Sequence, residues 1–392
     1  MQGRGLRARA AQPVTFVELF FDLVFVFAVT QVTVLTAHHL DPEGVARSLL
    51  LFWMIWWAWT QFTWTLNPAD TTHPGVRGLT LVASGVAFVM AASVAGAFDA
   101  GGAWFAVPYV AVRALGLTLQ LRVDLERPGV DRAGILGWVA WSSLGLVVVL
   151  LGAVVDPAIR PFVWLAAVGL DLLAATIAGR RATWDLHAAH LSERHGLFVI
   201  IAIGESLIVA GTAVAAEDRT TDLVAAVAAA IVVACLLWWT YFGWLKDACE
   251  HALAQLDPTR IGQAARDAFS LAHFPLVCGI VGFAVAIEEI VAHPSDPAPP
   301  EVVAALGIGI ALFVGFSAVA WRRLSRAWLA PRFAVLAVMG GALVVVGAAA
   351  VAPVWPLVVV AAALVAIVVL ERRPLAAVGP VSAGPGALPL PH

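Results

Sequence analysis

The chain has few charged residues, few cysteines and none of the short motifs that mark common soluble enzymes. Charged side chains make up 12% of its 392 residues, hydrophobic side chains make up 61%, and the mean hydropathy is +0.91. A soluble globular domain is ordinarily about 25% charged and about 45–50% apolar. The composition therefore excludes an ordinary soluble domain and predicts a polytopic membrane protein.

The missing motifs narrow the function further. No GxxxxGK[ST] phosphate loop is present, which argues against an ATP-driven pump of that type, and neither GxSxG nor HExxH occurs. No basic tract carries interleaved aromatic residues, so nucleic acid is not an expected partner. The three cysteines have no CxxC or other ligand spacing. We therefore expect no metal and no cofactor.

Long apolar runs predict an all-α fold, a helical bundle in the membrane. A membrane-spanning helix needs about 20 predominantly apolar residues, and the breaks between the runs carry loop chemistry, as in Asp41–Gly44 and Asn67–Gly75. We expect about twelve transmembrane helices. They fall near residues 15–36, 46–66, 78–98, 103–121, 134–155, 161–179, 195–215, 223–245, 269–292, 301–321, 333–351 and 353–370.

Positive charge predicts the orientation of these helices. With a cytoplasmic N-terminus, 19 of the 23 Lys and Arg residues fall in cytoplasmic segments, and Arg113 stays within the membrane. Cytoplasmic loops are the ones enriched in Lys and Arg, so we expect both termini in the cytoplasm. The cytoplasmic set includes Arg194 and Arg332, and the three residues outside are Arg47, Arg160 and Arg219.

The chain also resembles itself across its two halves. Trp56-Trp57 recurs as Trp238-Trp239 at an offset of 182 residues, and Asp22 corresponds to Glu205 at 183. We expect two parallel six-helix repeats, since an even number of helices per unit gives both copies the same orientation. The predicted division is a basic cytoplasmic arm over 1–14, repeats over 15–190 and 191–373, and a disordered tail over 374–392.

Four ionisable residues lie deep inside apolar runs: Asp22, Arg113, Asp171 and Glu205. Each costs roughly 2.5–3.5 kcal/mol by insertion scales unless it is paired or hydrated, so these residues must face the bundle interior. Arg113 needs an acid, which leaves at least one carboxyl group over, and an unpaired buried carboxyl can exchange a proton near neutral pH. The structural alternative is that Arg113 with Asp171 or Glu205 only fixes helix packing.

Two further patterns concern the cytoplasmic ends of helices. Glu18 and Asp22 are four residues apart and share one helix face. The segment WDLHAAHLSERHG carries a polar helix end made of His187, His190, Glu193, Arg194 and His195. It could be a solvated cap, a pH sensor or a weak zinc site of His187, His190 and Glu193. Arg194 could equally reach Glu18. The small residues Gly204 and Ser206, on either side of Glu205, favour close approach of another helix.

Three stretches carry a resemblance to a known family. The stretch VELFFDLVFVFAVTQ, the tryptophan cluster with its NPAD loop, and HLSERHGLFVIIAIGESL are similar to the bacterial low temperature requirement protein A family. The resemblance implies a multi-pass protein of the bacterial cytoplasmic (inner) membrane with no assigned reaction. The matching positions are Glu18, Phe21, Asp22, His190, Glu193, Arg194, Gly204, Glu205 and Ser206.

The leading prediction is a proton-coupled secondary transporter or permease of an unidentified small molecule or ion, with membrane lipids as its surroundings. Asp22 and Glu205 would be coupling or substrate carboxylates, with Arg113 as counter-charge or anion site and Asp171 as a second proton acceptor. We expect these side chains to converge on one water-filled chamber between the two helical halves. Glu18, His190, Glu193 and Arg194 would form a cytoplasmic gate. Alternatives are an intramembrane enzyme acting on lipid, with His190 and Glu193 as its acid–base pair, and a sensor or scaffold in cold adaptation.

Overall fold

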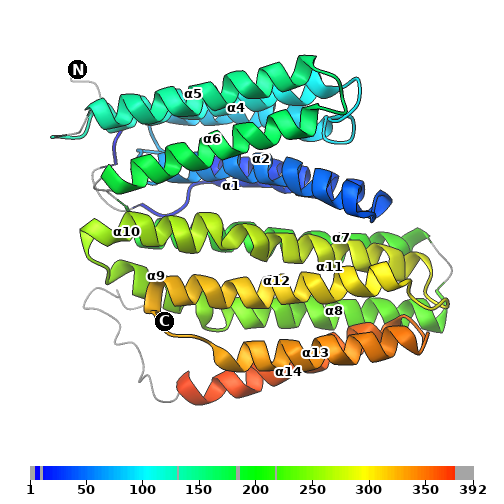
Figure 1. Ribbon diagram of the computed structural model, residues 1–392. Helices are drawn as coiled ribbons and strands as arrows, with labels where there is room; N and C mark the ends of the chain where they lie inside the picture. Colours follow the sequence, from blue (N-terminus) through cyan, green and yellow to red (C-terminus); the bar gives the residue numbers. More distant parts are fainter. Residues whose placement is uncertain (1–4, 9–11, 130–131, 182–185, 217–218, 376–392) are drawn as a thin grey trace, which may run out of the picture.

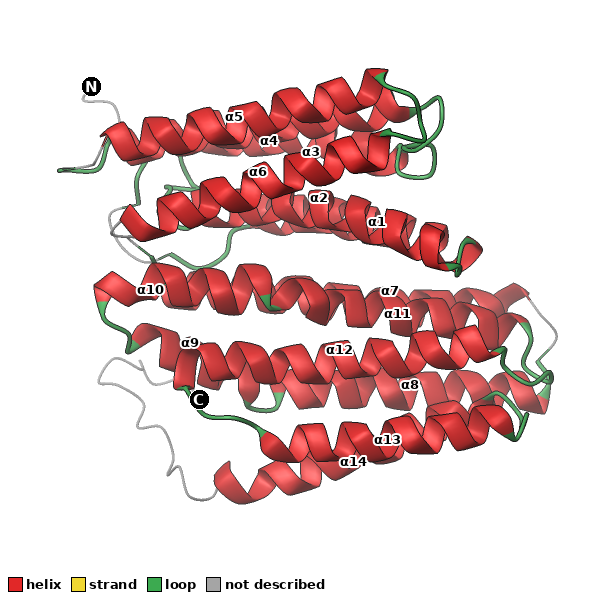
Figure 2. Cartoon of the chain, in the orientation of Figure 1, coloured by secondary structure: helices red, strands yellow, loops and turns green. Residues whose placement is uncertain are grey.

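The computed structural model describes residues 5–8, 12–129, 132–181, 186–216 and 219–375, and within these ranges it is built from helices without strands (Figures 1 and 2). The α-helices are α1 (Phe16–His38), α2 (Pro42–Leu66), α3 (Pro74–Ala92), α4 (Gly102–Leu125), α5 (Arg132–Val154), α6 (Arg160–Arg181), α7 (Ala188–Ala216), α8 (Thr221–Phe242), α9 (Leu245–Ala254), α10 (Pro258–Ala265), α11 (His273–Ala292), α12 (Pro300–Ser325), α13 (Ala330–Ala348) and α14 (Val354–Leu375). A π-helix, η1 (Arg266–Leu271), joins α10 to α11.

Each of the twelve predicted apolar runs coincides with a long helix. Ten helical spans among the described residues are long and apolar enough to cross a membrane. The two long helices outside this set are α2 and α6, with 25 and 22 residues. At about 1.5 Å per residue both are long enough to cross, and α2 is less apolar because it carries polar side chains into the bundle interior.

Short polar caps define where several helices begin. Asp41 accepts hydrogen bonds from the backbone of Glu43 and Gly44, both at 3.0 Å, and Pro42 occupies the first helical position of α2. Thr220 caps α8 in the same way by accepting from Leu223. These caps satisfy N–H groups that have no partner inside the helix. These caps lie at the breaks between apolar runs, so the ends of the runs could be recognised in the sequence.

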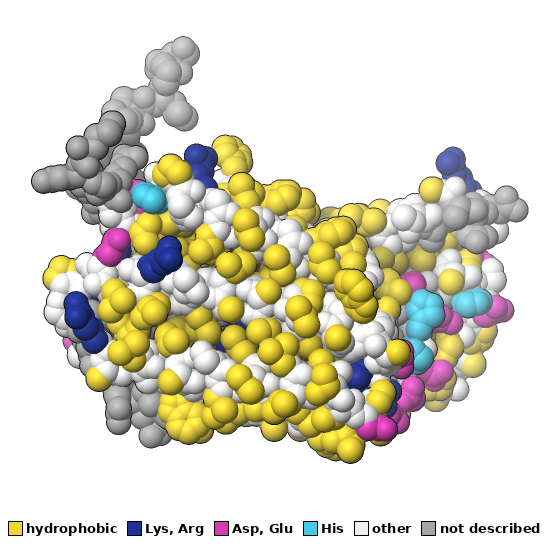
Figure 3. Space-filling model, turned by 90° about the horizontal axis from the view of Figure 1, so that it is seen from above, with side chains coloured by type: hydrophobic (Ala, Val, Ile, Leu, Met, Phe, Trp, Pro, Cys, Tyr) yellow, Lys and Arg dark blue, Asp and Glu magenta, His cyan; other side chains and the backbone are white. Residues whose placement is uncertain are grey.

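The helices form two groups with a seam between them. Figure 1 shows α1–α6 in one group and α7–α14 in the other, with α1 beginning and α14 ending at the same side of the molecule. Across the seam, α1 packs against α7 and α11, and α2 packs against α7 and α11. Figure 3 shows hydrophobic side chains over the middle of one face, with most charged side chains towards its two ends. This surface suits a protein that is surrounded by lipid.

The segment between α8 and α11 corrects a prediction. The sequence predicted no helix between 245 and 269, and the structure forms α9, α10 and η1 there. A π-helix is rare and frequently marks a functional site. Ser270 in η1 accepts hydrogen bonds from two tryptophans of α2: Trp56 donates to its carbonyl oxygen and Trp64 to its hydroxyl, both at 2.8 Å. This pair of bonds fixes the second group of helices against the centre of the first.

Two arginines that were predicted in loops are buried at helix starts. Arg332 in α13 is fully buried and forms an ion pair with Glu371 of α14, with Nε 2.6 Å from Oε1. Arg160 in α6 is 3% exposed and donates to the carbonyl oxygens of Ala97 and Gly152 at 2.9 and 3.1 Å. Both are buried because partners from neighbouring helices replace water, which the sequence position alone did not reveal.

The ends of the chain bear on two more predictions. Within the predicted arm, Arg7 forms a β-bridge with Ala69, and the backbone N–H of Leu6 donates to Glu126 at 2.7 Å, so this part packs beneath α2 and α4. At the other end α14 continues to Leu375, which includes the first residue of the predicted tail, Pro374. The remainder of that tail, from 376 onward, lies outside the described residues.

Candidate functional site

Two carboxylates of α1 lie side by side in the interior. Thr15 caps the helix, and its N–H and hydroxyl both donate to Glu18 at 2.9 and 2.8 Å. Glu18 and Asp22 are both fully buried, and their i, i+4 spacing places them on one face of α1. The same face continues with buried Phe25 and Val29. A pair of buried carboxylates needs positive charge nearby, because an uncompensated buried charge is strongly destabilising.

Arg194 of α7 supplies that positive charge. Its Nη1 donates to Glu18 at 3.0 Å, and its Nε donates to Asp22 at 3.1 Å. Its Nη2 donates to the second oxygen of Asp22, which also accepts from the indole N–H of Trp59 at 2.7 Å. The contact that we expected between Arg194 and Glu18 is therefore present. Arg194 lies near the start of α7 and is fully buried, which its place in a polar helix end did not indicate.

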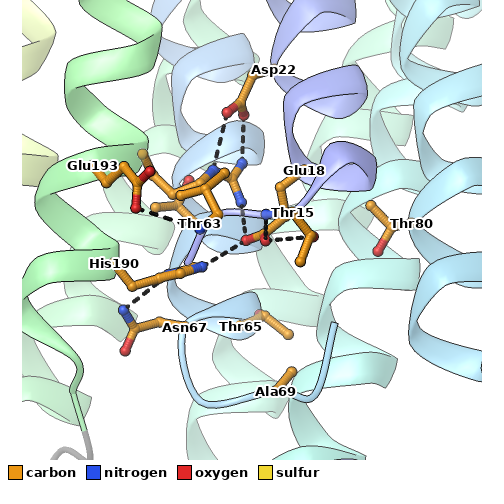
Figure 4. A network of polar contacts seen from close by, with 12 residues as sticks. Thr15, Glu18, Asp22, Thr63, Thr65, Asn67, Ala69, Thr80, His190 and Glu193 are labelled. Carbon is orange, nitrogen blue, oxygen red and sulfur yellow. Dashed lines mark hydrogen bonds and ion pairs between the residues drawn. The ribbon is translucent and has the colours of Figure 1, made fainter. Parts of the chain in front are cut away.

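His190 and Asn67 complete this cluster, which we call the latch (Glu18, Asp22, Trp59, Asn67, His190 and Arg194). Figure 4 labels Glu18, Asp22, Asn67 and His190 of the latch. His190 Nε2 lies 3.0 Å from Glu18, and His190 is 2% exposed, so the expected solvated cap is wrong at this residue. Asn67, at the end of α2, donates to the carbonyl oxygen of His187 at 3.0 Å and accepts from its N–H at 2.8 Å. The side chain of Asn67 thereby fixes the start of α7 to α2.

The latch joins the two groups of helices through charge. It contains two carboxylates and one guanidinium, and the imidazole of His190 lies against Glu18. Glu193 lies beside it and accepts from the backbone N–H of Val14 at 3.4 Å (Figure 4). The described residues contain no group of three or more His, Cys, Asp or Glu side chains placed to hold a metal ion.

A second buried ion pair joins α4 to α6. Arg113 Nη2 donates to Asp171 at 2.7 Å, and these residues are 1% and 6% exposed. The sequence required an acid for Arg113, and Asp171 meets that requirement. The guanidinium carbon of Arg113 also lies 6.0 Å from the centre of the Tyr109 ring. Unlike Arg194, Arg113 keeps two nitrogens, Nε and Nη1, without a hydrogen-bond partner among the described residues.

Arg113 lines a cavity of about 80 Å³, which we call the chamber. The side-chain amide of Gln61 and the hydroxyl of Thr60 are likewise buried without partners among the described residues. Buried polar groups are nearly always hydrogen-bonded, so such a concentration marks a place for water or a ligand. The chamber is lined by Trp57, Thr60, Gln61, Trp64, Arg113, Gln120, Trp138, Ser142, Asp171, Ala175, Gly262, Arg266 and Ser270.

Glu205 lies apart from the other ionisable residues. Asp22 contacts Arg194, and Glu205 follows Arg194 by eleven residues on α7, or about 16 Å along the helix axis. Asp22 and Glu205 therefore do not share the single chamber that we expected. Glu205 is half-buried and has no hydrogen bond or ion pair with another described residue.

Close helix approach occurs at different glycines from those predicted. A Cβ atom built at Gly204 would have no neighbour within 4 Å, so no helix packs closely there. At Gly279 of α11 a Cβ atom would lie 2.4 Å from the backbone oxygen of Gly309 in α12. Small residues allow backbones to meet, but the sequence does not say which small residues face another helix.

Several residues of these sites escaped sequence reasoning. Trp59 belongs to a tryptophan cluster that served as evidence of a repeat and of the family resemblance, and Asn67 belongs to a motif that was interpreted as a loop. The interaction of Arg332 with Glu371 joins helices that are adjacent in sequence, and Glu371 also accepts from the indole of Trp244 at 3.0 Å. One available signal was that Glu371 is an acid at the end of an apolar run.

Comparisons with known proteins place these features in a family. The family model described as bacterial low temperature requirement A protein (LtrA) matches residues 13–369, which include the latch and the chamber. An uncharacterized protein of Rhizobium meliloti (strain 1021) is 29% identical over 289 residues, covering 71% of this chain and 70% of that protein. No solved structure matches the chain.

Proposed function

We propose that this chain, which belongs to the bacterial low temperature requirement A family, is a secondary transporter of the bacterial cytoplasmic membrane. In this proposal a small solute binds in the chamber. The two groups of helices then move relative to each other, so that the chamber opens to one side of the membrane and then to the other. The latch stabilises one of these two arrangements of the helix groups.

The chamber is the observation that carries the proposal. An unsatisfied buried polar group costs about 1–3 kcal/mol, and more when it is charged. Arg113, Thr60 and Gln61 each present unpaired atoms, although all three are at least nine-tenths buried. A protein that only needed stable packing would gain by pairing or replacing these groups. Their retention next to a cavity favours a binding site that a ligand completes.

The arrangement of the helices supports motion about the seam. In the first group α1 packs on α2 and α3, and α3, α4, α5 and α6 pack in succession; in the second α7 packs on α8 and α11, and α11, α12, α13 and α14 pack in succession. This correspondence favours two parallel six-helix repeats with twelve crossings and cytoplasmic termini. Transporters built from related halves bind substrate between them and alternate by rocking.

The ionisable residues take different roles in this proposal. Arg113 and Asp171 bind the solute, and Glu205 exchanges the coupling proton, since it is a membrane carboxyl group without a partner among the described residues. Glu18, Asp22, His190 and Arg194 form the cytoplasmic gate as the latch, with Glu193 beside them. The alternative of a lipid enzyme has less support, because its proposed acid, His190, already faces the carboxylate of Glu18.

Accessibility of the chamber from both sides tests the proposal without knowledge of the substrate. With the three native cysteines replaced by alanine, Ser142→Cys places a thiol in the chamber wall. A membrane-impermeant maleimide should label this thiol in right-side-out and in inside-out vesicles. Leu144→Cys, from the same helix, is the control. Leu144 is 45% exposed on the apolar surface of the protein, which we expect to face lipid, so this thiol should be labelled from neither side. Labelling of Ser142→Cys from one side only, or from neither, would contradict transport.

The same thiol tests the role of Glu205. If Glu205 couples proton binding to the movement of the helix groups, external pH should change the rate at which Ser142→Cys is labelled from one side, beyond its effect on the reagent itself. The additional substitution Glu205→Gln should remove that dependence while labelling continues. An unchanged dependence in the Glu205→Gln variant would exclude Glu205 as the coupling residue.

A further inference from the structure

The unpaired polar atoms of the residues that line the chamber indicate the charge of its ligand. Arg113 keeps its Nε and Nη1 free, and both are donors on a group that stays positively charged. Asp171 neutralises the guanidinium through Nη2 alone. Arg266 also lines the chamber and is paired with Asp267 through Nη2 at 2.7 Å. The unpaired atoms of Arg113 are therefore hydrogen-bond donors. They need an acceptor on the ligand, such as a carboxylate or carbonyl oxygen.

Gln61 adds both a donor and an acceptor beside Arg113. A Cβ atom built at Gly116 would lie 3.0 Å from Cδ of Gln61, so the absence of a side chain at Gly116 makes room for the amide. Gly116 follows Arg113 by three residues on α4, which places both on one face of that helix. The free amide of Gln61 is thus held next to the face that carries the guanidinium.

The walls and the size of the chamber limit the body of the ligand. Trp57, Trp64 and Trp138 line it, which disfavours a strongly hydrated inorganic anion that would lose its water against indole rings. The chamber's volume of about 80 Å³ is roughly half that of an engineered cavity of about 150 Å³ that binds benzene, so the chamber admits a small molecule. A molecule of a few heavy atoms with one apolar side fits these limits.

From these contacts we propose that the chamber binds a short-chain monocarboxylate, a molecule of the size of acetate or propionate. Its carboxylate accepts hydrogen bonds from the free nitrogens of Arg113 and from the amide nitrogen of Gln61. Its alkyl group lies against the tryptophan walls. The assignment deepens the proposed function by naming the class of solute, and it rests on that function only for the claim that the bound molecule is carried across the membrane.

Binding of propionate to the full-length protein in detergent tests the proposal. At neutral pH and constant ionic strength, sodium propionate should raise the thermal unfolding midpoint in a saturable way relative to sodium chloride, since a ligand of the folded state stabilises it. It should also change the tryptophan fluorescence with the same concentration dependence, because three tryptophans line the chamber.

Two variants assign the binding to the chamber. The double substitution Arg113→Gln with Asp171→Asn removes both charges together and keeps a neutral pair, so that no charge is left unpaired. It should weaken propionate binding at least about tenfold, the loss expected when a hydrogen bond to a charged group is removed. Gln61→Leu leaves the ion pair intact and should also weaken binding. The matched control is Arg332→Gln with Glu371→Gln, which removes a buried arginine pair away from the chamber and should leave propionate binding unchanged.

Different outcomes overturn different parts of the proposal. Sulfate or phosphate that stabilises the protein where propionate does not would make the chamber an inorganic-anion site. Decanoate that binds where propionate does not would indicate a carboxylate derived from lipid. Propionate binding that survives the Arg113→Gln and Asp171→Asn substitutions would place it elsewhere. If Ser142→Cys is labelled from both sides but propionate does not bind, the monocarboxylate assignment is wrong and transport still stands. If propionate binds but the thiol is labelled from one side only, the protein is a carboxylate receptor and transport is excluded.

Discussion

The latch and the chamber both contain a buried arginine, and they differ in how completely that arginine is paired. In the latch all three guanidinium nitrogens of Arg194 donate to Glu18 or Asp22. In the chamber Arg113 has one carboxylate partner and two free nitrogens. A fully satisfied buried network makes a structure rigid, and a partly satisfied one next to a cavity leaves capacity for a ligand. The comparison teaches that intramembrane charge can hold helices together or receive a solute, and that pairing distinguishes the two.

Removal of the latch arginine should give the largest effect. Arg194→Gln leaves Glu18 and Asp22 buried with much less positive charge, and breaking a buried pair in this way costs about 3–5 kcal/mol. We expect a large fall in the thermal unfolding midpoint in detergent. Arg47→Gln is the control, because Arg47 forms an exposed i, i+4 ion pair with Glu43 and should change stability little. If Arg194→Gln were as stable as Arg47→Gln, the claim that full pairing of Arg194 stabilises the fold would be wrong.

Removal of the chamber arginine should cost less, about 2–3 kcal/mol for Arg113→Gln, because the chamber admits water to the Asp171 carboxylate that remains. The addition of Asp171→Asn should restore part of the loss, since no unpaired charge is left. Thermal unfolding of the single and double variants measures both effects. If Arg113→Gln were as damaging as Arg194→Gln, the chamber pair would be a packing element like the latch.

A single hydrogen bond of the latch can be removed without a change in charge. Trp59→Phe deletes the indole donor to Asp22 and keeps an aromatic ring in place, so the expected loss is roughly 1.5 kcal/mol. Trp53→Phe is the matched control on the same helix, because the indole N–H of Trp53 has no hydrogen-bond partner among the described residues. Thermal unfolding midpoints of the two variants compare them directly. Equal losses would show that Asp22 does not depend on its tryptophan partner.

The smallest predicted effect on stability concerns Asp41, an exposed carboxylate that serves as a comparison for the buried carboxylates of the latch and the chamber. The backbone N–H groups of Gly44 and Glu43 hold the pKa of the exposed Asp41 below its usual value. The bonds that lower the pKa stabilise the folded protein above roughly pH 4, the ordinary aspartate pKa, and this contribution disappears as the pH falls through the lowered value. The stability difference between wild type and Asp41→Ala should therefore shrink as the pH falls towards 3. A difference that is independent of pH would show that the cap does not depend on charge.

Much of the fold was predictable because lipid imposes a simple rule on the sequence. Each of the twelve apolar runs coincides with a helix, since a backbone surrounded by hydrocarbon must satisfy its hydrogen bonds internally. The segment with α9, α10 and η1 was missed because its polar residues resemble those of a loop. The partner of Arg113 was required by charge, and the structure provides it in Asp171. The expectation that Asp22 and Glu205 share a chamber failed because their positions on α1 and α7 fix no contact between those helices.

The sequence by itself determined that this chain is a membrane bundle of long helices and that its buried ionisable residues must find partners inside the protein. Both follow from local quantities, namely the apolar length of each run and the cost of charge in lipid. Only the tertiary structure decided that Arg194 is fully paired and Arg113 is not. That outcome depends on which helix faces meet, and helix packing brings together residues such as Asp22 and Arg194 that are far apart along the chain. No periodicity within a single helix encodes such a meeting.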